Sequence, residues 1–256
     1  MIAQTKSPFK ANSQFAQEID SFLAQYGAVF AQEAKRTSAF FELAAYNDIV
    51  KFYETADYTV SPENLKGTGG KQFVYALSPS AKPENCSYFL AKKVYKSGKT
   101  YSFEIRHNVR IQSFHDEEIF VSPDYAVIEK GSIVSIKKVD FYNGKVDYFF
   151  VAADKVKTFA ETKHYAPGPE LVLNFVGLVN ELMPKLMANN FPTKPPMHFG
   201  PSLFVSGIGN PHLQKIRDSL GKRYTINVFL GLFAFPSQVY SASNQVNIKK
   251  IGSSWK

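Results

Sequence analysis

Apolar residues near the start of the chain recur at the three- and four-residue spacing of helices. This spacing predicts one helix over residues 12–26 and a second over residues 40–53. Thr37 and Ser38 stand directly before the second run, where a hydroxyl can cap the first turn of a helix. Ser61–Pro62 lies just beyond its end. The amino-terminal part of the chain is therefore expected to be helical.

From residue 87 onward the apolar period drops toward two, which is typical of strands. Asn143–Gly144 separates two such segments and is the strongest sequence signal for a two-residue hairpin turn. The turn Lys96–Lys99 separates two others. The expected strands cover residues 87–96, 100–113, 118–129, 132–142, 145–151 and 156–165.

The remainder of the chain mixes helices and strands. Leu171, Phe175, Leu178 and Leu182 share one face of a helix predicted over residues 170–189. A short buried strand over 203–205, a helix over 211–222 and a strand over 224–233 complete the pattern. We therefore predict an α/β fold with a mixed central β-sheet flanked by helices.

The chain has 256 residues, of which 45% are hydrophobic and 20% are charged, as is typical of a globular protein. We expect a single domain over residues 1–256. No apolar run reaches the roughly 18 residues that cross a bilayer, and the amino terminus lacks the apolar segment of a secretory signal. The single cysteine, Cys86, cannot form an intrachain disulfide. These features predict a cytoplasmic protein without a membrane partner.

The net charge is +8, a balance that favours encounters with polyanions. Only five of the 30 basic residues are arginine. Reading of base edges relies on arginine, whereas lysine suffices for contacts with phosphate. The composition thus favours nucleic acid as a partner, bound with weak sequence selectivity, although a lysine-rich solvated surface explains the same count.

Two glycine-containing segments come close to nucleotide-binding motifs. Gly98–Lys99–Thr100 matches the end of a phosphate-binding loop, but Lys93 stands where the first glycine is required. Gly207–Ile208–Gly209 follows an expected strand, but His212 occupies the third glycine position of a dinucleotide loop. A plain turn is the simpler interpretation of each segment. A nucleotide-responsive binding protein built on residues 207–210 stays open as a third function.

Acidic residues carry the remaining candidate chemistry, because the five histidines lack the spacing of a zinc site. Asp124 lies in one expected strand, and Glu161–Thr162–Lys163 ends another. Glu161 and Lys163 are two residues apart and therefore project from the same face of a strand. Two carboxylates from adjacent strands can hold Mg²⁺, and a nearby amine can orient water or stabilise negative charge. A solvated strand end with a weak ion pair is the plainer interpretation.

The segments Phe120–Ile128 and Lys157–Lys163 resemble the motif strands of the PD-(D/E)xK nuclease superfamily. The resemblance implies a restriction-endonuclease-like core over about residues 37–206, with a helix over 12–26 before it and a helix–strand extension over 210–235 after it. The hairpin between the motif strands is loosely similar to that of anti-phage effector nucleases.

The same resemblance implies a magnesium-dependent endonuclease that cuts double-stranded DNA, with Mn²⁺ as a substitute metal and a homo-oligomeric assembly. Asp124, Glu161 and the carbonyl of Thr162 would be metal ligands, and Lys163 would be the catalytic amine. Glu42 is the candidate for an additional acid from the first core helix. We expect its carboxylate to need a metal or Lys163 as a partner.

Two alternatives accompany this hypothesis. Asp147 could replace Asp124 as the first metal ligand, although we prefer Asp124 because apolar residues flank it as in a core strand. The chain could also be an inactive member of the same fold that binds nucleic acid or mediates assembly, since one fold supports many functions.

Overall fold

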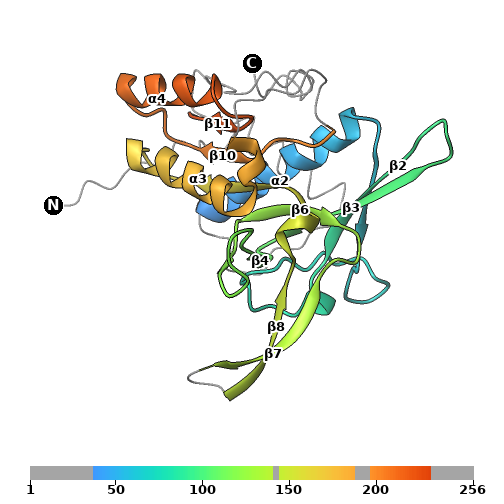
Figure 1. The fold of residues 1–256 in the computed structure, drawn as a ribbon. Coiled ribbons are helices and arrows are strands. Elements are labelled where there is room, and N and C mark those ends of the chain that lie inside the picture. The colour runs from blue at the N-terminus through green and yellow to red at the C-terminus, as the bar shows by residue number, and fades with distance from the viewer. Residues whose placement is uncertain (1–36, 141–143, 188–196, 232–256) are drawn as a thin grey trace.

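The structure is a computed structural model that describes residues 37–140, 144–187 and 197–231 (Figure 1). The helix predicted over residues 12–26 and Asn143 of the predicted turn lie outside these ranges. The described elements are α2 (Thr37–Thr55), β1 (Thr59–Glu63), the 3₁₀ turn η2 (Pro83–Asn85), β2 (Tyr88–Val94), β3 (Thr100–His107), β4 (Ile111–Gln112), β5 (Phe120–Val121), β6 (Tyr125–Glu129), β7 (Val134–Asp140), β8 (Gly144–Phe150), η3 (Ala153–Lys155), β9 (Val156–Lys163), α3 (Pro169–Leu182), η4 (Pro184–Met187), β10 (Ser202–Val205), α4 (Pro211–Gly221) and β11 (Asn227–Phe229).

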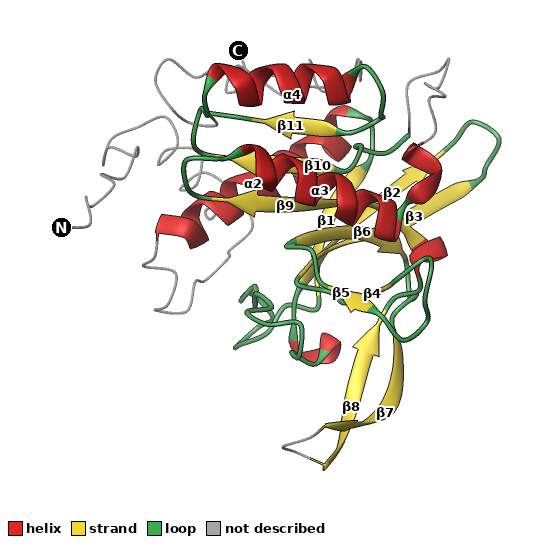
Figure 2. Ribbon diagram, turned by 60° about the vertical axis from the view of Figure 1, so that its left-hand side comes forward, coloured by secondary structure: helices red, strands yellow, loops and turns green. Residues whose placement is uncertain are grey.

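A seven-stranded sheet in the order β1-β2-β3-β6-β9-β10-β11 forms the centre of the fold (Figure 2). The strands from β1 to β9 pair antiparallel, whereas β9, β10 and β11 run parallel. Helix α3 connects β9 to β10, and α4 connects β10 to β11, as parallel neighbours require. The prediction of a mixed central sheet flanked by helices is confirmed.

Strand alternation divides the buried residues between two hydrophobic clusters. Tyr125 and Val127 of β6 join the cluster that contains the apolar residues of α2. Ala126 and Ile128 of the same strand join the second cluster, which contains the apolar faces of α3 and α4. Helix α2 therefore covers one face of the sheet, and α3 and α4 cover the other.

Three tyrosine hydroxyls in the α2 cluster make long-range hydrogen bonds. Tyr46 donates to the carbonyl of Ile105 over 2.8 Å, and the hydroxyl of Tyr53 lies 2.9 Å from Nδ1 of His198. Tyr125 donates to the carbonyl oxygen of Glu42 over 2.6 Å. Buried polar groups need such partners, so these bonds tie α2 to the sheet and the segment at His198 to α2.

The segment Ser61–Pro62, expected only to mark a helix end, belongs to strand β1. This strand lies at the edge of the sheet and pairs with β2 alone. Proline cannot donate a ladder hydrogen bond, and an edge strand is where that loss is tolerated. Strand β1 is therefore an element that the hydrophobic pattern did not predict.

The strand predicted over residues 118–129 is divided in the structure. Phe120–Val121 forms β5, which pairs with β4 in a small separate sheet, and the central sheet resumes only at Tyr125. Ser122, Pro123 and Asp124 belong to neither strand. The prediction that Asp124 lies within a strand is wrong, because Pro123 interrupts the pairing directly before it.

Other boundaries are shorter than expected. Helix α3 ends at Leu182 because Pro184 follows, and the residue before a proline disfavours helical geometry. Strand β11 covers three residues of the predicted range 224–233, whose last two residues lie outside the described part of the chain. Strands β7 and β8 form their own two-stranded sheet, which projects from the body (Figures 1 and 2). None of the described helices is long and apolar enough to span a bilayer.

We expect Phe204→Ala to destabilise the protein by about 3–5 kcal/mol, because the fully buried Phe204 ring stacks on Phe229 with centroids 4.9 Å apart. Urea unfolding measures the change. Val139→Ala, at a residue that is 79% exposed, is the matched control and should stay close to wild type. A loss below 1 kcal/mol for Phe204→Ala would contradict the described packing.

Candidate active site

The candidate site lies where the β6–β9 ladder ends. Tyr125 pairs with Ala160 in the last antiparallel step, so the same register places Asp124 opposite Glu161. The exposed fractions of the side chains are 21% for Asp124, 16% for Glu161 and 34% for Lys163. The three groups are therefore partly buried and still reach solvent.

The Asp124 carboxylate binds the main chain of β9. Its Oδ2 atom accepts a hydrogen bond from the N–H of Thr162 over 2.6 Å and another from the Thr162 hydroxyl over 2.8 Å. Continuing the register places Pro123 opposite Thr162. Because proline has no N–H, Pro123 cannot donate to the Thr162 carbonyl. Since the N–H and C=O of one strand residue point to the same side, the Thr162 carbonyl also faces this edge.

Lys163 lies between the two carboxylates. Its Nζ atom is 2.7 Å from Oε2 of Glu161 and 3.7 Å from Oδ2 of Asp124. Glu161 and Lys163 are alternate residues of β9, so both side chains leave the same face of the strand. The arrangement brings two acids and one amine into a single cluster.

The cluster has perturbed proton affinities. Burial and the adjacent negative charge of Asp124 raise the pKa of Glu161 from 4.5 to about 7, although Lys163 opposes this change. For Lys163, burial favours the neutral amine, but the charges of Asp124 and Glu161 outweigh burial and raise its pKa. Lys163 is therefore a cation at neutral pH.

Glu42 faces a histidine rather than the lysine expected from the sequence. Its Oε2 atom lies 3.5 Å from Nε2 of His107, which is buried. Tyr75 and Tyr125 have pKa values raised by burial, and the charges of Glu42 and Asp124 add to that effect on both. The two carboxylates therefore both act on this tyrosine pair, which lies beside the candidate site.

Asp147 lies on strand β8 of the separate hairpin. Its carboxylate forms an ion pair with Lys137 of β7 over 2.5 Å. The hydrogen bond from Lys137 lowers the pKa of Asp147. The structure thus groups Asp124, and not Asp147, with Glu161 and Lys163.

Asn108 and His107 are neighbours of the site that sequence reasoning missed. The N–H of Asn108 donates to the carbonyl of Asp124 over 2.9 Å, and Asn108 adopts a positive φ of 49°. His107 lies 2.5 Å from the carbonyl of Ala76 through Nδ1. Asparagine is enriched at positive φ, so Asn108 is a local sequence signal for a turn after β3. This signal does not show that the turn contacts Asp124.

The glycines after β10 have packing explanations. A Cβ atom on Gly207 would lie 2.5 Å from the carbonyl oxygen of Tyr165, so this position needs glycine. Asn210 caps α4 by accepting a hydrogen bond from the N–H of Leu213. Residues 207–210 fit a plain strand-to-helix turn, and the nucleotide-binding alternative stays a prediction.

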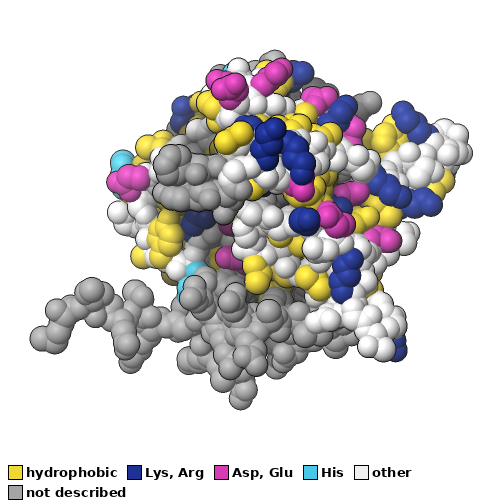
Figure 3. All heavy atoms as spheres, turned by 90° about the horizontal axis from the view of Figure 1, so that it is seen from below, with side chains coloured by type: hydrophobic (Ala, Val, Ile, Leu, Met, Phe, Trp, Pro, Cys, Tyr) yellow, Lys and Arg dark blue, Asp and Glu magenta, His cyan; other side chains and the backbone are white. Residues whose placement is uncertain are grey.

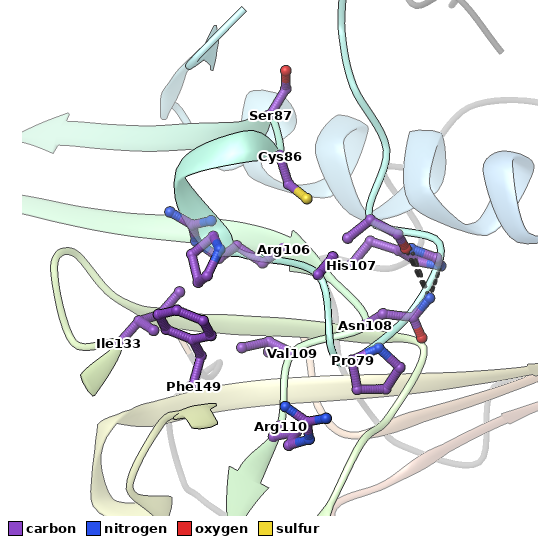
Figure 4. A pocket seen from close by; sticks show the side chains of 13 residues that line it. Pro79, Cys86, Ser87, Arg106, His107, Asn108, Val109, Arg110, Ile133 and Phe149 are labelled. Carbon is purple, nitrogen blue, oxygen red and sulfur yellow. Dashed lines mark hydrogen bonds between the residues drawn. The ribbon is translucent and has the colours of Figure 1, made fainter. Parts of the chain in front are cut away.

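Two pockets lie along β3. The smaller, with a volume of about 30 Å³, is lined by residues including Arg106, His107 and Asn108 (Figure 4). The larger, of about 550 Å³, borders Glu104 and Arg106, which form an ion pair of 2.6 Å. Neither pocket is lined by Asp124, Glu161 or Lys163.

Within residues 37–140, 144–187 and 197–231, no group of three or more histidine, cysteine or acidic side chains is placed to hold a metal ion. Comparisons of the chain with protein-family models, curated proteins and solved structures found no match.

The raised pKa of Glu161 makes the stability of the protein depend on pH. Because this pKa is higher in the folded than in the unfolded chain, the contribution of Glu161 to stability is complete below about pH 4.5 and is lost as the pH rises through about 7. Glu161→Gln removes this loss. We expect the melting temperature of Glu161→Gln, relative to wild type, to be higher at pH 8 than at pH 5.

Glu118→Gln, at an exposed position, is the control and should show the same difference from wild type at both pH values. A Glu161→Gln difference that does not change between pH 5 and pH 8 would argue against the described burial of the carboxyl group.

Proposed function

We propose that this protein is a magnesium-dependent nuclease with a restriction-endonuclease-like core, acting on double-stranded DNA. The observation that carries the proposal is the convergence of Asp124, Glu161 and Lys163 where β6 begins and β9 ends. The order of α2, antiparallel strands β3, β6 and β9, then α3 and parallel strand β10 supports it, because the PD-(D/E)xK core has that order.

The donor set suits a hard divalent cation. Asp124 and Glu161 supply carboxylate oxygens, and the Thr162 carbonyl faces the same edge of the ladder. Mg²⁺ prefers oxygen ligands and commonly keeps several waters, so one or two carboxylates suffice. Burial and the charge of Asp124 raise the pKa of Glu161, and a cation would offset the part that is due to this charge. When bound there, the metal would supply Lewis-acid stabilisation of a phosphodiester and a more acidic water.

The residues of the chain have separable roles in this proposal. Thr162 holds the Asp124 carboxylate through two hydrogen bonds and so fixes one ligand to the strand that carries the other. Lys163 is positively charged at neutral pH, which suits stabilisation of negative charge on the scissile phosphate and orientation of the attacking water. Its raised pKa argues against the amine as the general base.

The ion pairs of Lys163 favour a second candidate function. Because its amine lies 2.7 Å from Glu161, the cluster could be a structural ion-pair network in an inactive nucleic-acid-binding protein. Divalent-metal binding and cleavage distinguish the two functions. The homo-oligomeric state and the cytoplasmic location stay predictions.

Lys163→Met should lower DNA cleavage by about 10²-fold or more, because it keeps the apolar stem and removes the charge. Plasmid nicking with Mg²⁺ measures the change, and DNA affinity should stay close to wild type. Lys157→Met is the control on the same strand, since Lys157 pairs with Glu129 away from the site. Equal activity of wild type and Lys163→Met would remove this amine from the mechanism.

Asp124→Asn should abolish the calorimetric signal of Mg²⁺ binding and cleavage, because it removes a charged ligand. Asp147→Asn should leave both intact, since Asp147 pairs with Lys137 on the separate hairpin. The opposite outcome, with Mg²⁺ binding lost only in Asp147→Asn, would transfer the metal site to the hairpin and refute the proposed ligand set.

A further inference from the structure

The β2–β3 hairpin carries a dense group of positive charges. Lys92, Lys93, Lys96 and Lys99 lie within eight residues around its turn, and the hairpin projects from the body of the molecule (Figure 1). In Figure 3 the projecting right-hand end shows dark-blue side chains beside yellow and white surface. We call the four lysines together with Tyr95 and Tyr101 the hairpin tip.

Lys93, Lys99 and the half-buried tyrosines Tyr95 and Tyr101 share one face of this tip, whereas Lys92, which pairs with Ser102, lies on the other face. Lys93 pairs with Tyr101, and the N–H of Tyr95 donates to the carbonyl of Lys99, so these four residues lie on the same side of the ribbon. The rings of Tyr95 and Tyr101 meet edge to face with centroids 5.3 Å apart. The Lys99 ammonium lies 4.7 Å from the centre of the Tyr101 ring.

Most of this charge is uncompensated. Lys93 is the exception, because its ammonium donates to the carbonyl of Ala56 over 2.6 Å and lies 3.7 Å from Asp57. Lys92, Lys96 and Lys99 are exposed and form no ion pair with another described residue. A cluster of like charges on a small projecting ribbon repels itself, and bound phosphates would relieve that repulsion.

The other projecting hairpin, β7–β8, has a similar number of lysines, but other side chains engage two of them. Lys137 of β7 is paired with Asp147 of β8 over 2.5 Å. The Lys138 ammonium lies over the rings of Phe120 and Tyr148. Lys145 is exposed on the same hairpin. The β7–β8 hairpin therefore provides a matched control for the β2–β3 hairpin.

We propose that the hairpin tip is a docking surface for single-stranded nucleic acid, with lysines on the phosphates and bases stacked on Tyr95 and Tyr101. Positive charge that follows a backbone, combined with aromatic faces, is the common solution for binding single strands without sequence preference. Val94 is the only large, exposed apolar side chain at the tip, so the tip offers little apolar surface for insertion into a membrane.

The docking surface is separate from the candidate active site. Strand β3 runs from Thr100 at the tip to His107 beside the site, and these seven steps of extended strand cover about 23 Å. The docking surface and the proposed active site would both bind nucleic acid, but docking needs no cleavage chemistry. Binding measured without divalent metal therefore tests it independently.

The test is fluorescence anisotropy in EDTA with a labelled 20-nucleotide oligothymidine at several salt concentrations. Lys92/Lys96/Lys99→Gln should weaken binding by about tenfold or more and lower the slope of log affinity against log salt by about 2, since each single-strand phosphate contact contributes about 0.7. Lys137/Lys138/Lys145→Gln is the control and should change the slope by less than about 0.5. Lys92/Lys96/Lys99→Arg should retain binding, because it keeps the charges.

The tyrosines separate nucleic acid from a general polyanion surface. Tyr95/Tyr101→Leu should weaken oligothymidine binding by about fivefold or more and leave the salt slope unchanged, because stacking involves no counterions. Binding that is unaffected by the tip variants, or weakened equally by the control, overturns the proposal. The proposal is also overturned if the tip binds phosphatidylglycerol vesicles through its lysines and Tyr95/Tyr101→Leu has no effect on oligothymidine binding. Loss of cleavage in Lys163→Met concerns the active site alone and does not count against the docking surface.

Discussion

The hydrogen bonds between the Asp124 carboxylate and Thr162 determine how the candidate site is assembled. At the end of the β6–β9 ladder, a side-chain oxygen takes the place of the main-chain acceptor that would satisfy the Thr162 N–H. Pro123 stands directly before Asp124 and has no N–H for a ladder bond, and the central sheet resumes only at Tyr125. The Asp124 carboxylate thus continues the contact between the two segments beyond the last main-chain pair.

The same bonds concentrate negative charge where β9 ends. Asp124 directly precedes β6, Glu161 lies on the adjacent strand β9, and Lys163 compensates for one of the two charges when both are ionised. Burial then makes the second ionisation costly, as the raised pKa of Glu161 indicates. The cluster therefore holds an excess of negative charge, which the proposed cation would offset.

Local patterns account for the features that could be predicted from the sequence. Helix α3 and the hairpins follow from periodicity and turn residues, and the shared face of Glu161 and Lys163 follows from alternation within one strand. The edge strand β1 was missed because its partner β2 is distant in sequence and Pro62 obscures the signal. The contact between Glu42 and His107 joins residues 65 positions apart and depends on the packing of α2 against the sheet. Such long-range contacts have no local signature.

The tyrosine hydroxyls of the α2 cluster fix the alignment of α2 on the sheet at an otherwise apolar interface. Hydrophobic burial has no direction, whereas each of these hydrogen bonds needs its donor and acceptor in one relative position. The Tyr125 hydroxyl binds the main-chain carbonyl of Glu42 on α2. Tyr125 directly follows Asp124 in the chain. Helix and strand end are thereby locked in register, and any displacement of α2 would be transmitted to Asp124 through a single residue.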